Sequence, residues 1–77
     1  MTKELDGMIK FSNKYGDFEL KEDGTYNLDR VDASGGVETQ YGVLLVKDAG
    51  DSIVVLDITG LAAYYSKESI CRVEVAD

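Results

Sequence analysis

The sequence contains no histidine, no tryptophan and no proline, and Cys71 is its single cysteine. The absence of histidine removes the residue that most often serves as general base or metal ligand near neutral pH. With no second thiol, a disulfide within the monomer and an ordinary zinc site are both excluded. A lone cysteine is typical of a reducing compartment, so we expect a cytoplasmic location.

Long apolar stretches are also absent. The first six residues lack the apolar run of a secretion signal. The longest aliphatic runs, Val43–Val46 and Ile53–Leu56, have four residues each, whereas a membrane-spanning helix needs about 20. We expect one domain over residues 1–77. A chain of this length buries only about 60% of its unfolded surface, so association with another chain is one way to stabilise it.

The chain is strongly acidic. Fifteen acidic residues stand against eight basic ones, for a net charge of −7. The excess is spread evenly, with nine acids and five bases in residues 1–38 and six acids and three bases in residues 39–77. Such a charge repels phosphate backbones and anionic lipids. We therefore expect no direct nucleic-acid or membrane binding, and a partner with a basic protein surface.

Alternating polar and apolar residues predict a mostly β fold, either a small antiparallel sheet or an SH3-like or Sm-like barrel of about six strands. The expected strands cover residues 8–12, 17–21, 25–31, 39–47, 52–58 and 71–75. The Asp23-Gly24 pair favours a tight turn. It predicts a hairpin of residues 17–21 and 25–31, with one buried face made of Phe18, Leu20, Tyr26 and Leu28.

Residues 59–70 allow two readings. They form either a short helix capped by Thr59, or a strand over Ala62–Tyr65 followed by one helical turn over Ser66–Ser69; the strand reading is preferred. With it, the layout of residues 39–76 resembles small SH3-like and Sm-like barrels. This resemblance implies a fold and carries no function.

Apolar residues are concentrated in the second half of the chain. We expect an acidic hairpin layer over residues 1–33 and a more apolar core of strands over residues 39–77. The strand at Ile53–Ile58 has apolar residues on both faces, whereas an antiparallel sheet with one wet face alternates. Either the N-terminal hairpin or a second copy of the chain should cover the extra face, so we expect a homodimer.

No motif indicates catalysis, a cofactor or a metal. Cys71 has no histidine to activate it as a nucleophile, and we interpret it as a small inward-facing core residue. The spacing of an EF-hand does not occur. The Ser34–Val37 loop lacks the lysine and following helix of a phosphate-binding loop. These observations predict a non-enzymatic protein with no catalytic, cofactor-binding or metal-binding residues.

Acidic and tyrosine residues remain as candidates for partner binding. A row of carboxylates on a rigid sheet can imitate nucleic-acid phosphates, and in size and charge the chain resembles small acidic inhibitors carried by phages. We expect an interaction module, an inhibitor or adaptor that docks on a basic nucleic-acid-binding protein. The alternative is a small-ligand or metal-ion binding domain that uses acidic turns or a barrel mouth. The candidate partner-binding residues are Asp17, Glu19, Glu22, Asp23, Asp29, Asp32, Tyr64 and Tyr65.

Overall fold

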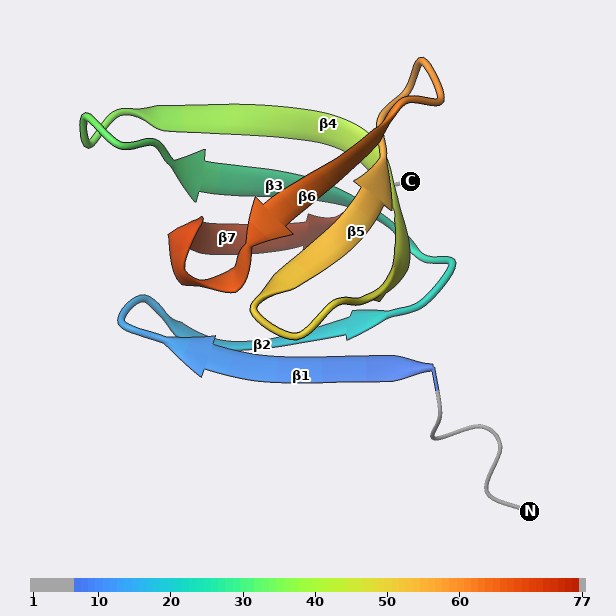
Figure 1. The fold of residues 1–77 in the computed structure, drawn as a ribbon, viewed down its shortest axis with the longest axis horizontal. Helices are drawn as coiled ribbons and strands as arrows, with labels where there is room; N and C mark the ends of the chain where they lie inside the picture. The colour runs from blue at the N-terminus through green and yellow to red at the C-terminus, as the bar shows by residue number, and fades with distance from the viewer. Residues whose placement is uncertain (1–6, 77) are drawn as a thin grey trace.

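The computed structural model describes residues 7–76, so the predicted domain limits at residues 1 and 77 lie outside it. The prediction of a mostly β fold is confirmed (Figure 1). Within these residues no helix is long and apolar enough to cross a membrane. The elements are β1 (Met8–Asn13), β2 (Gly16–Lys21), β3 (Thr25–Val31), β4 (Val37–Asp48), β5 (Ser52–Leu56), β6 (Ala62–Ser66), the 3-10 turn η2 (Lys67–Ser69) and β7 (Ile70–Val75).

The strands form two antiparallel sheets. The larger sheet has the order β6-β5-β4-β3-β7, and the smaller one is the β1-β2 hairpin. Figure 1 shows this hairpin lying as a separate layer against the larger sheet. In the described part of the chain β6 and β7 are the outer strands of the larger sheet and do not pair with each other, so no closed barrel is found there.

The long strand β4 joins the two halves of the larger sheet. Its first half pairs with β3 and its second half with β5, and Figure 1 shows it bending between the two. Gly42 lies at the bend with a φ of 62°, a conformation that side chains other than glycine disfavour. Its amide donates to Oδ1 of Asn27 at 2.9 Å, opposite the point where the β3-β4 register shifts.

The predicted hairpin of residues 17–21 and 25–31 is wrong in its pairing. Both segments are strands, but β2 pairs with β1, and β3 pairs with β4 and β7. The reason lies in the connection: the amide of Asp23 donates to the carbonyl of Leu45, and the amide of Leu45 donates to the carbonyl of Gly24. The turn therefore carries the chain from one sheet to the other.

The predicted buried face survives this change, because the two strands meet face to face in the core. Leu20 and Leu28 are both 1% exposed, and Phe18 packs against their cluster. The backbone amide of Lys21 donates to the hydroxyl of Tyr26 at 2.8 Å. The core draws on both halves of the chain; its buried members are Ile9, Leu20, Tyr26, Leu28, Val43, Leu45, Ile53, Val55, Tyr65 and Ile70.

The last third of the chain follows the preferred reading, with a strand, one helical turn and a final strand. The prediction for Cys71 is wrong, because the β3-β7 register shifts at this residue. Ile70, opposite Arg30, fills the core position and is fully buried. Cys71 is only half-buried, and its thiol lies 3.5 Å from the carbonyl oxygen of Asp29.

Candidate functional site

The six candidate acids do not form one face, because they are divided between the two sheets. Asp17 and Glu19 lie on the outward side of β2, where each has a partner across the hairpin. The hydroxyl of Ser12 donates to Asp17 at 2.6 Å, and Nζ of Lys10 lies 3.9 Å from Glu19. The predicted row of free carboxylates is thus replaced here by two local pairs.

Asp29 and Asp32 belong to the other sheet and its β3-β4 loop. Asp29 accepts a hydrogen bond from the Thr39 hydroxyl at 2.8 Å and lies 3.8 Å from Arg72. Oδ1 of Asp32 accepts from the hydroxyl and amide of Ser34 and from the amide of Gly36. These bonds, led by the Ser34 hydroxyl, hold the pKa of Asp32 below its usual range.

The two remaining acids lie in the β2-β3 connection. Glu22 is half-buried and continues the hairpin ladder, because its amide donates to the carbonyl of Gly7 at 2.6 Å. Asp23 is exposed and has a φ of 70°. The structure therefore brings neither residue together with the acids of β2 or β3 into a common cluster.

Two further acidic turns are closed by their own hydrogen bonds. Asp48 accepts from the amide of Gly50 and from Nζ of Lys67 at 2.7 Å. Asp57 accepts from the amide and hydroxyl of Thr59 and from the amide of Leu61. The pKa of both carboxyls is lowered, chiefly by the Lys67 and Thr59 side chains respectively. Over residues 7–76 no group of three His, Cys, Asp or Glu could hold a metal ion.

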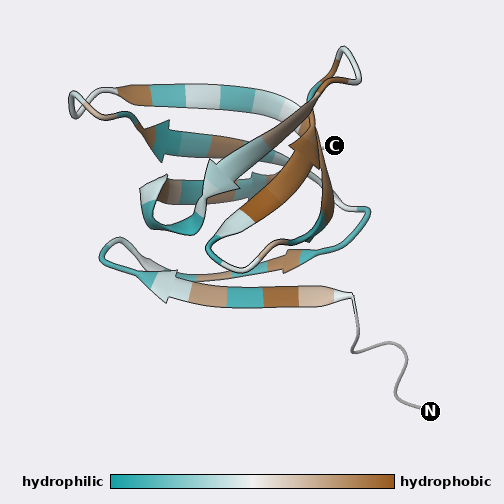
Figure 2. Cartoon of the chain, viewed as in Figure 1, coloured by the Kyte–Doolittle hydropathy of each residue, from teal (hydrophilic) through white to brown (hydrophobic). Residues whose placement is uncertain are grey.

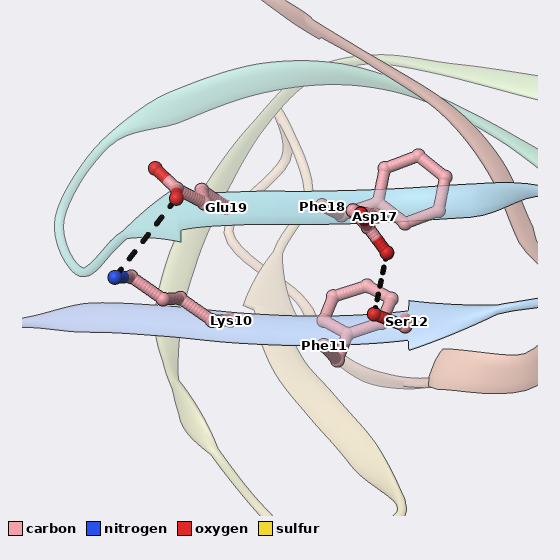
Figure 3. A pocket seen from close by; sticks show the side chains of 6 residues that line it. All are labelled: Lys10, Phe11, Ser12, Asp17, Phe18 and Glu19. Atoms are coloured by element: carbon pink, nitrogen blue, oxygen red, sulfur yellow. Dashed lines mark hydrogen bonds and ion pairs between the residues drawn. The ribbon is translucent and has the colours of Figure 1, made fainter.

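A hollow of about 310 Å³ lies on the β1-β2 hairpin (Figure 3). The Lys10–Glu19 and Ser12–Asp17 pairs border it, and its charged groups are already paired. The rings of Phe11 and Phe18, with centroids 5.3 Å apart, pack against the core. Ligand pockets usually enclose most of a small molecule, and this open hollow on a two-stranded sheet offers no such enclosure.

The two candidate tyrosines lie on opposite faces of β6, as their adjacent positions predict. Tyr64 is 70% exposed and Tyr65 is 5% exposed. The guanidinium of Arg30 lies 4.1 Å from the centroid of the Tyr65 ring, and NH2 of Arg30 lies 3.3 Å from Glu38. Burial raises the pKa of Tyr65, and the charge of Arg30 partly opposes this shift.

The sequence did not lead us to single out Arg30, although the alternation of residues in β3 indicates where its side chain lies. Tyr26 and Leu28 alternate on the inward face of β3, and the same alternation places Arg30 inward. Its Nε atom is buried without a hydrogen-bond partner among residues 7–76. The stacked ring and Glu38 compensate for an inward-facing charge, which points to a structural role.

The outward face of the larger sheet carries an apolar surface. The sequence indicated two parts of it, the second apolar face of residues 53–58 and the candidate residue Tyr64. The register places Leu44, Leu56 and Ala62 side by side across three strands. Val54 and Tyr64 are paired on the same face. Ile58 lies against the bend of β4, because its Cγ2 atom is 3.1 Å from the position that a Cβ atom would take if Gly42 had a side chain. Tyr41 shares the outward side of β4 with Thr39, whose hydroxyl reaches Asp29.

We call this surface the outer apolar patch and define it by Tyr41, Leu44, Leu56, Ile58, Ala62 and Tyr64. Three of its members are largely exposed: Tyr41 at 69%, Ile58 at 78% and Tyr64 at 70%. Figure 2 shows that β5, the strand that carries Leu56, is hydrophobic over most of its length. The hairpin packs on the inward side of the sheet. On the outward side Val54 is buried and Leu44 and Leu56 are half-buried, so the exposed apolar area lies mainly at Tyr41, Ile58 and Tyr64.

Comparison with protein-family models, with curated proteins and with solved structures gives no match for this chain. The assignment of a function therefore rests on the geometry and chemistry of its own residues.

Proposed function

We propose that the protein is a non-enzymatic interaction module that binds a basic protein partner through the outer apolar patch. The observation that carries the proposal is the exposure of three members of the patch: Tyr41 on β4, Tyr64 on β6 and Ile58 in the loop between β5 and β6. Contiguous apolar surface of this kind marks interaction sites on soluble proteins. Tyrosine is enriched in such interfaces because it offers a large contact area with few rotatable bonds.

The patch supplies the affinity in this proposal. Full burial of one large apolar side chain stabilises a complex by about 1.5–3 kcal/mol. Tyr41 and Ile58 together therefore contribute a substantial part of the binding free energy. Interfaces concentrate their energy in a few such central anchors.

The net charge of −7 supplies the preference for a basic partner. Because the acids are distributed over both sheets, they act as a long-range attractive field rather than as a row of contacts. Such a field accelerates association with a positively charged surface and weakens as salt is added. An inhibitor or adaptor of a nucleic-acid-binding protein fits this chemistry, and a cytoplasmic location is part of the proposal.

The test is affinity capture from a lysate of the source organism at low and at high salt. The immobilised baits are the wild type, a Tyr41→Ser/Ile58→Ser variant and a Tyr15→Ser/Val37→Ser control. The control removes exposed apolar residues outside the patch. A captured protein is identified by mass spectrometry, purified and titrated against all three baits by calorimetry.

The proposal expects a basic protein that binds the wild type and the control, loses at least about tenfold in affinity for the patch variant, and dissociates at high salt. The tenfold figure corresponds to about 1.4 kcal/mol, which is less than the burial of one patch side chain contributes. Equal affinity for the patch variant, or binding that is indifferent to salt, would contradict it.

A further inference from the structure

Strand β6 has an unoccupied hydrogen-bonding edge. In the loop that precedes it, the amide of Asp57 donates to the carbonyl of Leu61, and after it the amide of Lys67 donates to the carbonyl of Asp51. In an antiparallel pair of strands, every second residue directs its N–H and C=O groups toward the partner strand. Because Leu61 and Lys67 do so, Ala63 and Tyr65 also direct their backbone groups toward β5. The N–H and C=O groups of Ala62 and Tyr64 then point away from the sheet. No hydrogen bond from elsewhere in residues 7–76 reaches them.

This edge also lacks the usual protection against strand pairing. Natural edge strands carry charged residues, proline or bulges that block a second chain. The other strands with a free edge contain charges: Lys10 in β1, Asp17, Glu19 and Lys21 in β2, Glu38 in the first half of β4, and Arg72 and Glu74 in β7. β6 reads Ala-Ala-Tyr-Tyr-Ser, without a charge or a register shift. It is therefore the strand best suited to accept a partner.

We infer that β6 pairs with β6 of a second copy of this chain, antiparallel and about a two-fold axis at Ala63. In this register Ala62 stands opposite the partner's Tyr64, and the symmetry repeats the pair. All four open backbone groups of each copy are then satisfied in two hydrogen-bonded pairs. At the axis, the two Ala63 residues face each other as a closely spaced, non-hydrogen-bonded pair, a position that their small side chains can occupy.

The choice of a second copy rests on the pattern of the strand itself. An edge without charged residues meets no charge on the same edge of a second copy, and the two-fold axis sets the small Ala62 against the large Tyr64 on both sides. On the outward face the Tyr64 ring of each copy lies beside Ala62 of the other, because directly opposite residues share a face. These contacts also cover part of the outer apolar patch, at Ala62 and Tyr64.

This inference does not depend on the proposed function. It does extend it: joining two β6 edges makes one continuous sheet, and the two outer apolar patches then lie on either side of the axis. A dimer presents two copies of Tyr41 and Ile58 to a partner, and two linked sites raise the apparent affinity without a new contact.

The oligomeric state is measured by sedimentation equilibrium across a concentration series. The wild type should approach twice the chain mass of 8.4 kDa. An Ala62→Lys variant, which places a charge on the edge, should remain at the single mass, whereas a Val37→Lys control should behave as the wild type. A wild type that stays at the single mass, or an Ala62→Lys variant that still dimerises, would overturn the inference.

Amide hydrogen exchange tests the register and carries its own control. The amides of Ala63 and Tyr65 bond to β5 and should be protected at every concentration. The amides of Ala62 and Tyr64 should gain protection only as the dimer forms, and should lose it in Ala62→Lys. Fast exchange at Tyr64 in a fully dimeric sample would refute the pairing of β6, even where the mass shows a dimer.

Discussion

The carboxamide of Asn13 donates one hydrogen bond to the carbonyl of Ile70, at 2.8 Å, across 57 positions of sequence. The same nitrogen donates to the carbonyl of Lys67 at 2.7 Å. These bonds tie the end of β1 to η2 and the start of β7. They are part of what holds the hairpin layer on the larger sheet.

Replacing Asn13 by aspartate should therefore destabilise the fold. A carboxylate keeps the acceptor that the amide of Tyr15 uses, but it cannot donate and would face two carbonyl oxygens. We expect a loss of about 2 kcal/mol in the free energy of unfolding, since each hydrogen bond contributes about 0.5–1.5 kcal/mol. Urea denaturation measures it. An Asn13→Asp protein as stable as the wild type would show that the hairpin is held by its apolar face alone.

Gly24 should not tolerate a side chain. A Cβ there would lie 2.9 Å from the carbonyl oxygen of Lys21 and from the ring of Tyr26. Such overpacking costs about 1–3 kcal/mol, so Gly24→Ala should lower the urea midpoint clearly. Gly7→Ala is the matched control, because its Cβ would meet only Glu22 at 3.9 Å. Equal midpoints for the two variants would contradict the tight packing of this turn.

Asp57 should make stability depend on pH at the acid end. Hydrogen bonds from Thr59, Leu61 and the turn lower the pKa of its carboxyl from the ordinary 3.8. As the pH falls below this value the unfolded chain takes up the proton first, so the stabilisation is present at neutral pH and lost in acid. Asp57→Asn keeps an acceptor without titrating. The stability difference between the two proteins should therefore shrink as the pH falls below 3.8; a constant difference would rule out this linkage.

Tyr65 should make the free energy of unfolding depend on pH at the alkaline end. Its pKa is raised above 10.0, mainly by burial. As the pH passes this value the unfolded chain loses the proton first, so folding loses free energy as the pH rises. Tyr65→Phe removes this titration and should show a smaller loss of stability between pH values below and above 10.0. Parallel stability curves for the two proteins would contradict the burial of the hydroxyl.

Local pattern was sufficient to place the strands but not to pair them. Alternation predicted the segments that became β1, β2 and β3, and the inward positions of Leu20 and Leu28. The Asp23-Gly24 turn suggested that β2 and β3 are neighbours in one sheet. Turn residues fix where the chain reverses, and the partners of each strand depend on distant groups such as the amide of Leu45.

Register shifts explain the other differences. The shift at Cys71 moves it out of the core and puts Ile70 in its place. The bend at Gly42 lets one strand serve two partners. The shift at Cys71 has no local sequence signature, because it depends on which strand lies opposite, whereas a glycine inside a strand pattern, as at Gly42, indicates a bend or bulge. The outer apolar patch was predicted only in part for the same reason: the second apolar face of residues 53–58 was recognised, but Tyr41 and Tyr64 join it only through the order of β4, β5 and β6.

Site-specific photo-crosslinking at Ile58 tests the proposed binding face most directly. Ile58 is 78% exposed, belongs to the outer apolar patch and lies outside β6, so a benzoylphenylalanine at this position reports on the partner rather than on dimer formation. The same group at Tyr15, on the hairpin turn, is the control. The account predicts that position 58 crosslinks to a basic protein in the source lysate and that position 15 does not. Crosslinking of that protein from position 15 alone, or none from position 58, would contradict it.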